Sequence, residues 1–324
     1  LLKSIEVECR DMNGKNQTSI SEFLLLGLSS QPEQQNLLFW LFLCVYLVTV
    51  TGNLLIMLAI GLDTRLHSPM YFFLANLSFV DICFSSVTIP KMLVNHIIGS
   101  NSISYVECMM QMYFFITFVN MDGFLLVVMA YDRYMAICRP LHYTTVMRPG
   151  LCILLVAISW VITNLHALLH TLLMAQLSFC ADNTIPHFFC DPYPVRKLSC
   201  SDTYISDLMV FTVGGVVFVT PFTCIAISYV FIFSNVMKIP STQGMQKALS
   251  TCGSHLTVVS LFYGAIMGIY LRPSSSYSAV DTVATVIFTV VTPMLNPFIY
   301  SLRNQDMKVA LRRLILTKAI LQMS

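Results

Sequence analysis

Seven long apolar stretches alternate with short polar segments along the chain. They begin at Leu37, Pro69, Met109, Leu151, Leu208, Ala248 and Val283. At roughly 20 residues or more, each is long enough to cross a ~30 Å hydrocarbon core as an α-helix, whereas the strands of a membrane β-barrel are about half that length and alternate in polarity. The pattern therefore predicts an all-α integral membrane protein, built as a bundle of seven transmembrane helices.

The polar segments set the boundaries of the expected parts. We expect an extracellular tail over residues 1–36, the seven-helix bundle over 37–302, and a cytosolic segment over 303–324. In that last segment apolar residues recur at helical spacing between basic ones, which predicts a short amphipathic helix on the membrane surface; a disordered tail is the alternative. The apolar residues are Met307, Ala310, Leu311, Leu314 and Ile315.

Composition supports the membrane assignment. Hydrophobic residues make up 56% of the chain and charged residues only 10%, whereas about 25% of a soluble domain is charged. Most of the surface is therefore expected to face lipid. The net charge of +2 is too small to suggest a nucleic-acid partner.

Basic residues gather in one set of connections and in the C-terminal segment. Because Lys and Arg in short loops stay on the cytosolic side, we expect an extracellular N-terminus and a cytosolic C-terminus. Residues 1–36 lack the apolar core of a signal peptide, so the first span is expected to direct insertion. The basic residues are Arg65, Arg133, Arg139, Arg148, Lys238, Lys247, Arg303, Lys308, Arg312, Arg313 and Lys318.

Two features of the predicted outer side agree with this orientation. Asn16-Gln17-Thr18 is an N-glycosylation sequon. Four cysteines also lie on that side, where disulfides persist, and they allow three pairings among which spacing does not choose. They are Cys108, Cys180, Cys190 and Cys200.

An acid and an arginine stand side by side in "MAYDRYMAIC", residues 129–138, at the cytosolic end of the third span. Asp132 would hold Arg133 while the bundle is closed, and the released guanidinium could then donate to a partner's backbone carbonyls. Such a pair is a two-state element, as a switch requires. The alternative is a plain basic anchor that snorkels to the interface.

Several motifs together resemble the olfactory receptors, the odorant-sensing branch of the rhodopsin-like G-protein-coupled receptors. The resemblance extends from about Asn16 to Lys318, with every motif in family order. The motifs are "LHSPMYFFLANLSFVD" (66–81), "MAYDRYMAIC" with "RPLHY" (129–143), "SY" (228–229), "KALSTCGSHL" (247–256) and "PMLNPFIYSLRN" (293–304).

The resemblance implies a plasma-membrane receptor, not an enzyme, that raises cAMP through a stimulatory olfactory-type G protein. It implies the disulfides Cys108–Cys190 and Cys180–Cys200. It also implies a switch region in which Tyr229 and Tyr300 turn toward Arg133 when the sixth helix moves outward. The switch residues are Asp132, Arg133, Tyr134, Tyr229, Thr251, Ser254, His255, Asn296, Pro297 and Tyr300.

The resemblance also places an odorant pocket in the outer half of the bundle. The implied lining is mostly apolar and holds no carboxylate, which suits a small neutral volatile molecule such as a ketone, ester, aldehyde or terpenoid rather than an amine. The alternative role for each residue is ordinary helix packing. The residues are Met112, Phe115, Ile116, Val119, Asn120, His166, His170, Val213, Val217, Tyr263, Ile266, Met267, Tyr270, Val286 and Thr289.

Two acidic residues, Asp81 and Asp122, lie within predicted spans, where an unpaired charge is costly. In the resembled fold Asn53 and Asn296 would neighbour Asp81. Carboxylate and amide oxygens suit a hard cation, so we expect a structural sodium ion or, alternatively, a protonated hydrogen-bonded network. No other cofactor is expected.

Other classes explain less of the sequence. An ion or proton transporter or channel would account for the intramembrane acids, but the chain shows no internal repeat of the kind that many transporters contain. His187 and Asp191 beside Cys190 form an incomplete set of metal ligands.

Overall fold

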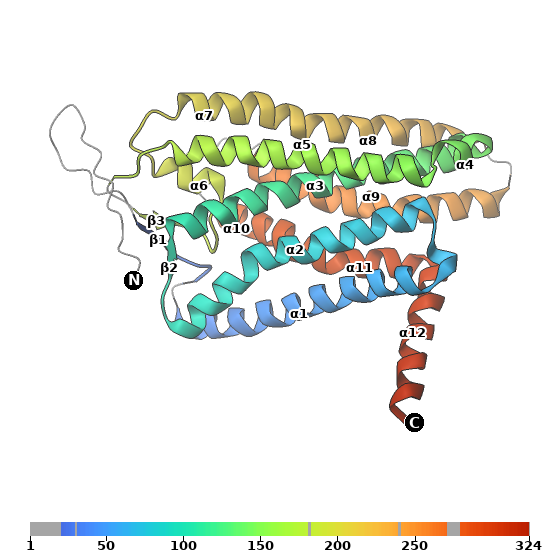
Figure 1. Cartoon of the computed structure of the whole chain (residues 1–324), viewed down its shortest axis with the longest axis horizontal. Helices are drawn as coiled ribbons and strands as arrows, with labels where there is room; N and C mark the ends of the chain where they lie inside the picture. The colour runs from blue at the N-terminus through green and yellow to red at the C-terminus, as the bar shows by residue number, and fades with distance from the viewer. Residues whose placement is uncertain (1–20, 30, 181–182, 239–240, 271–278, 324) are drawn as a thin grey trace.

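The computed structural model describes residues 21–29, 31–180, 183–238, 241–270 and 279–323. Seven helical spans lie side by side along its long axis (Figure 1). The first four are the single helices α1 (Pro32–Leu62), α2 (Pro69–Ile98), α3 (Tyr105–Cys138) and α5 (Pro149–Ala175). The sixth is α9 (Thr242–Tyr270). The all-α bundle predicted from the apolar pattern is confirmed.

The fifth and seventh spans each contain a short π-helical segment. The fifth is built from α7 (Tyr204–Met209), η3 (Val210–Gly214) and α8 (Gly215–Val236). The seventh is built from α10 (Ala279–Val286), η4 (Ile287–Val291) and α11 (Thr292–Arg303). Such wider turns inside helices are frequent at functional sites.

Local sequence signals set where the spans begin. Pro32, Pro69 and Pro149 each occupy the first turn of a helix, where a missing N–H has no intrahelical partner to lose. In α3, Ser104 and Glu107 form a capping box, each side chain accepting from the other's backbone N–H at 3.2 Å. Several helices run beyond the predicted apolar stretches, because hydropathy marks the lipid-buried part only.

Helix α3 occupies the centre of the bundle. It is the most buried span and packs against α2, α5 and α8. Large apolar side chains on α1, α5 and α8 point outward instead, among them Leu58, Leu165 and Val230. Outward-facing apolar residues are what a lipid environment requires.

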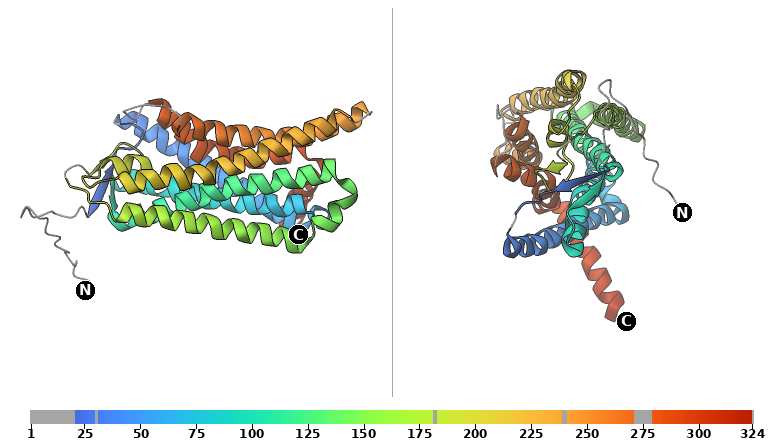
Figure 2. Two further views of the ribbon diagram at one scale, coloured as in Figure 1. Left: turned by 90° about the horizontal axis from the view of Figure 1, so that it is seen from above. Right: turned by 90° about the vertical axis from the view of Figure 1, so that its left-hand side faces the viewer.

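A small sheet covers the end of the bundle that carries the disulfides, which we call the disulfide end. Strand β1 (Glu22–Leu25) lies between β2 (Ser102–Ser104) and β3 (Thr184–Ile185), antiparallel to β2 and parallel to β3. Figure 2 shows β1 crossing this end of the molecule. The tail expected from the sequence is therefore partly a structured cover. A short helix, α6 (Pro192–Lys197), lies in the longest connection of the same end.

The opposite end, which we call the Arg133 end, carries short connections: η1 (Thr64–Leu66), η2 (Pro140–His142) and α4 (Tyr143–Val146). The last helix, α12 (Gln305–Met323), leaves the bundle there at a steep angle (Figures 1 and 2). Met307 and Ala310 are buried against the bundle while Arg312 and Arg313 are exposed. Over residues 305–314 the helix has one apolar and one basic side, as predicted, and the side chain of Ile315 lies outside the described residues.

Candidate functional site

Two disulfides fix the longest connection, one to the bundle and one within the connection itself. Cys108 at the start of α3 bonds Cys190, with Cα atoms 5.5 Å apart. Cys180 bonds Cys200, with Cα atoms 6.0 Å apart. These are the pairings that the family resemblance implied. Asn16, the sequon residue, lies outside the described residues.

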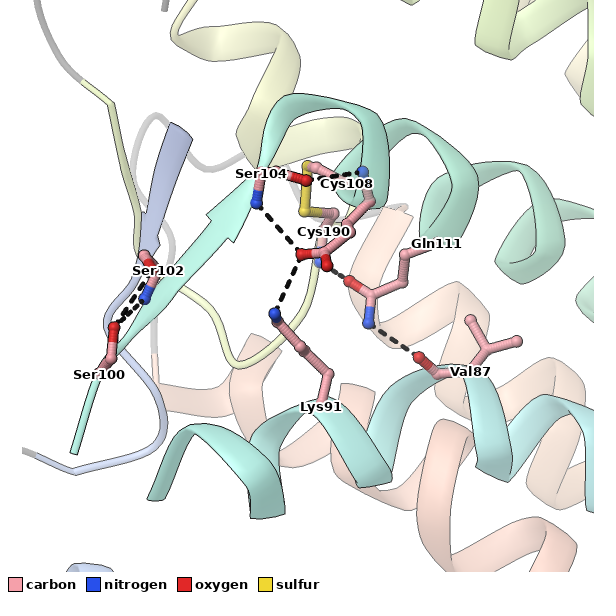
Figure 3. Close-up of polar contacts among 9 residues, drawn as sticks. Val87, Lys91, Ser100, Ser102, Ser104, Cys108, Gln111 and Cys190 are labelled. Carbon is pink, nitrogen blue, oxygen red and sulfur yellow. Dashed lines mark hydrogen bonds and ion pairs between the residues drawn. A yellow bond between two sulfur atoms is a disulfide. The ribbon is translucent and has the colours of Figure 1, made fainter. Parts of the chain in front are cut away.

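Gln111 on α3 reinforces the first disulfide. Its side-chain oxygen accepts from the backbone N–H of Cys190 at 2.8 Å, and its nitrogen donates to the backbone oxygen of Val87 on α2 at 2.8 Å. Nearby, Lys91 forms an ion pair with Glu107 at 3.0 Å. Figure 3 shows how these contacts join α2, α3 and the connection at one point. Sequence reasoning missed Gln111 because its partners are backbone atoms distant in sequence.

The connection contains two buried titratable side chains, His187 and Asp191. The Asp191 carboxylate accepts from the backbone N–H of Tyr193 at 2.8 Å, and burial raises the pKa of Asp191 to about 6. His187 accepts from the backbone N–H of Phe188 at 2.9 Å, and burial lowers the pKa of His187 to about 3. Within the described residues no cluster of three metal-ligating side chains is present.

The residues predicted to line the odorant pocket lie toward the disulfide end, on α3, α5, the fifth span, α9 and the seventh span. Most of them are buried or half-buried. An aromatic cluster lines the region around Phe115, whose ring centroid is 4.9 Å from Phe189 and 5.5 Å from Phe84. The side chain of Tyr270, which was also predicted to line the pocket, is not among those that the structure describes.

Sequence reasoning missed three members of this cluster, Phe84, Phe189 and Phe288. Phe288 lies 5.4 Å from Phe84 and 6.2 Å from Phe115 by ring centroids. Phe189 precedes Cys190, so the disulfide to α3 holds it over the bundle. That adjacency was the available signal for Phe189.

At the Arg133 end, Asp132 and Arg133 take different directions. The Asp132 carboxylate accepts a hydrogen bond from the Tyr143 hydroxyl at 2.8 Å, across to α4. Arg133 is buried, and its Nε and Nη1 atoms have no hydrogen-bond partner. Among the ion pairs of the described chain, none joins Asp132 to Arg133. The expected direct pair is therefore replaced by Asp132–Tyr143, because successive residues on a helix do not face each other.

Arg133 lines a cavity of about 420 Å³ at this end. Ser254 from α9 and Tyr300 from α11 share the cavity with it, so residues of the predicted switch region meet around one space. The other lining residues are Met70, Leu74, Met129, Ser250, Asn304, Gln305 and Asp306.

Tyr229 and His255 connect three helices beside this cavity. The Tyr229 hydroxyl and His255 Nδ1 are 2.9 Å apart, and His255 Nε2 lies 3.0 Å from the backbone oxygen of Leu126. Since a carbonyl only accepts, Nε2 carries the proton and Nδ1 accepts from Tyr229. Tyr134 lies to one side against Phe231, at 6.1 Å between ring centroids. The side chain of Thr251 is not among those described.

Between the two ends lies a buried polar cluster. Asn296 Nδ2 donates to both carboxylate oxygens of Asp81 at 3.0 Å, and Asn53 Nδ2 donates to the backbone oxygen of Pro293 at 3.2 Å. One oxygen each of Asn53, Asp122 and Asn296 is buried without a hydrogen-bond partner. Unpaired acceptor oxygens fit either a hard cation or a shared carboxyl proton. Pro297 is buried on α11, one residue after Asn296.

The seven spans, the disulfide-tied connection and the cavity around Arg133 define an integral membrane protein with the architecture of a receptor bundle. Comparison with known proteins makes the class specific. The family model for olfactory receptors matches residues 42–318, and the chain belongs to the olfactory receptor family. It is not an enzyme.

Known relatives match nearly end to end. "Olfactory receptor 1f45" of Rattus norvegicus is 63% identical, over 94% of this chain and 97% of the relative. "Olfactory receptor 1F1" of Homo sapiens is 61% identical, over 94% of this chain and 98% of the relative. "Olfactory receptor 1E1" of Pan troglodytes is 62% identical, with 94% and 97% covered.

Proposed function

We propose that this receptor binds small neutral volatile molecules in the outer half of its bundle and activates a stimulatory, olfactory-type G protein that raises cAMP. Family membership supports odorant sensing. The observation that carries the coupling is the buried Arg133, which lines the cavity of about 420 Å³ at one end of the bundle and has two guanidinium nitrogens without a hydrogen-bond partner. The apolar and aromatic character of the opposite half supports a neutral ligand.

The proposed orientation puts the disulfide end outside the cell and the Arg133 end in the cytosol of the plasma membrane. Its support is the charge asymmetry of the connections and the location of both disulfides at one end. Asn16 would then carry a glycan on the outer side. The basic side of α12 would face lipid headgroups.

The proposed switch opens the cytosolic cavity. Outward movement of α9 would separate Ser254 from Arg133 and let Tyr229 and Tyr300 turn inward. Arg133 could then donate to backbone carbonyls of the G protein, which would satisfy nitrogens that have no partner in the closed bundle. An odorant shifts the receptor toward this open state only to the extent that it binds the open state more tightly than the closed one.

The test is a cAMP assay in cells supplied with the olfactory-type G protein, screened with a panel of volatiles. Arg133→Ala should abolish both basal and odorant-dependent cAMP at matched surface expression, whereas Arg139→Ala, a matched control at the same end, should retain them. A response of Arg133→Ala equal to wild type would refute the role given to this residue.

We further propose that a sodium ion binds between Asp81, Asp122, Asn53 and Asn296 in the inactive receptor. Replacing sodium with a large organic cation should then raise basal cAMP, and Asp122→Asn should remove the sensitivity. Equal responses of wild type and Asp122→Asn to the exchange would refute the sodium site.

A further inference from the structure

Two histidines on α5 present unpaired nitrogens toward the fifth span. His166 and His170 are one helical turn apart, with ring centroids 4.4 Å from each other in an edge-to-face arrangement. The Nε2 atom of each ring is buried and has no hydrogen-bond partner. A buried polar atom without a partner costs free energy, so a pair of them at one place calls for a ligand group.

Asn120 on α3 determines which His166 nitrogen carries the proton. Its Nδ2 atom lies 2.7 Å from the backbone oxygen of Ile116 and 3.0 Å from His166 Nδ1. Because the Ile116 carbonyl only accepts, the amide nitrogen, not its oxygen, must face it. The second amide hydrogen then points to Nδ1, which accepts. His166 is therefore the neutral tautomer with its proton on Nε2, a hydrogen-bond donor.

Gly214 leaves room in front of this donor. It ends the π-helical segment η3 of the fifth span. A Cβ atom built on Gly214 would lie 3.9 Å from His166 Nε2 and 4.0 Å from His170 Nε2. Apart from the neighbouring residues and backbone of its own helix, no other atom would lie within 4 Å of it. A glycine at a π-helical segment thus opens a methyl-sized space beside two imidazoles.

A metal ion is the obvious alternative occupant, and the hydrogen bonds argue against it. A metal-bound Nε2 needs its lone pair free, and the other ring nitrogen then donates to an acceptor. Here Asn120 donates to Nδ1, which fixes the opposite tautomer. In the part of the chain that the structure describes, no third metal-ligating side chain joins the pair.

We infer that His166 Nε2–H binds the oxygen of a carbonyl odorant, a ketone, aldehyde or ester, in the space that Gly214 leaves. The inference rests on the proposed function, because it concerns the odorant pocket of that receptor. It narrows the ligand class to molecules with a strong hydrogen-bond acceptor. Asn120 is a positioning residue, since it acts through the His166 tautomer.

The experiment compares straight-chain methyl ketones with the secondary alcohols made by reducing them, in the cAMP assay. Wild type should respond to ketones at lower concentration than to the matched alcohols. His166→Phe should raise the EC50 for ketones about tenfold, the effect of losing one buried hydrogen bond. His166→Gln retains an N–H donor and should recover part of the response.

Asn120→Asp gives the sharpest readout. An aspartate oxygen would accept from His166 Nδ1–H, so the ring proton would leave Nε2 and turn that atom into an acceptor. The receptor should then prefer alcohols, which donate, over ketones. A merely structural role for Asn120 would weaken both series equally, and that result would overturn the inference.

Gly214→Ala supplies an independent variant, because the added methyl group fills the space beside both Nε2 atoms. It should weaken ketone responses, while Gly215→Ala, whose Cβ would meet no atom within 4 Å, should not. Unchanged ketone potency in His166→Phe or Gly214→Ala overturns the inference. Wild-type silence toward ketones, with Arg133-dependent basal cAMP intact, also overturns it and leaves the proposed function standing.

Discussion

Asp132 and Arg133 are adjacent in the sequence but serve different contacts in the folded chain. Asp132 holds the connection after α3 through the Tyr143 hydroxyl, while Arg133 stays available to the cavity. Burial and the nearby Asp132 carboxylate raise the pKa of Tyr143, so the hydroxyl remains a donor. The sequence predicted that both residues matter but not their partners, because Tyr143 lies on a separate short helix.

Removing the Tyr143 hydroxyl should loosen the inactive state. A hydrogen bond to a charged group is worth about 1.5–3 kcal/mol, and a shift of even about 1 kcal/mol toward the active state multiplies its population about fivefold. Tyr143→Phe should therefore raise basal cAMP several-fold at equal surface expression. Tyr131→Phe is the control, and equal basal signalling in the two variants would contradict this role.

The pKa values of His187 and Asp191 make opposite contributions to pH-dependent stability. Burial raises the Asp191 pKa from 3.8 to about 6, so the folded chain binds that proton more tightly, and acidification from pH 7 to 5 favours folding through this group. Burial lowers the His187 pKa from 6.5 to about 3, so the unfolded chain is protonated first and the same acidification opposes folding. Arg196 is the nearby charge that stabilises ionised Asp191.

Single variants should separate the two effects. We expect the unfolding temperature of Asp191→Asn to fall relative to wild type as pH drops from 7 to 5, and that of His187→Gln to rise. Over this pH range the free energy of unfolding of each variant should change by about 1–2 kcal/mol relative to that of wild type. Thermal unfolding of the purified receptor at each pH measures both, and variant curves parallel to wild type would show that these groups are not linked to folding.

At the scale of elements, helices were predictable and the sheet was not. A transmembrane helix is recognised by an uninterrupted apolar stretch, and the length of that stretch alone excludes a strand. Strand β1 buries Phe23 and Leu25 and exposes Glu22 and Leu24, but the apolar Leu24 hides this alternation. Its partner strands come from residues 102–104 and 184–185, and no local pattern reveals such distant pairing.

The sheet should stabilise the disulfide end through backbone bonds rather than side chains. The backbone N–H of Leu24 donates to the backbone oxygen of Asn183 at 2.8 Å, while the side chain of Leu24 is 41% exposed. Leu24→Pro removes that donor and should lower surface expression and thermal stability, whereas Leu24→Ala should change both little. Similar losses in the two variants would show that the side chain, not the pairing, matters.

For the whole molecule, the apolar pattern was sufficient to predict the bundle, and the motifs were sufficient to predict the family and, through the family resemblance, both disulfide pairings. The geometry of the sites was not predictable, since it depends on which side chains meet across helices. The cavity at Arg133 brings together residues of α2, α3, α9, α11 and α12, and the His166–Asn120 contact joins α5 to α3. The proposed switch and the proposed ligand chemistry both rest on these juxtapositions.

The central claim is that this bundle activates a stimulatory G protein through Arg133. Its most direct test is nucleotide exchange on the purified G protein, with the purified receptor in lipid nanodiscs and a mixture of volatile ketones and esters as ligand. Wild type should accelerate exchange several-fold over the G protein alone, and Arg133→Ala should return it to that background. Folded wild-type receptor that leaves the exchange rate unchanged, with both disulfides intact, would contradict the account.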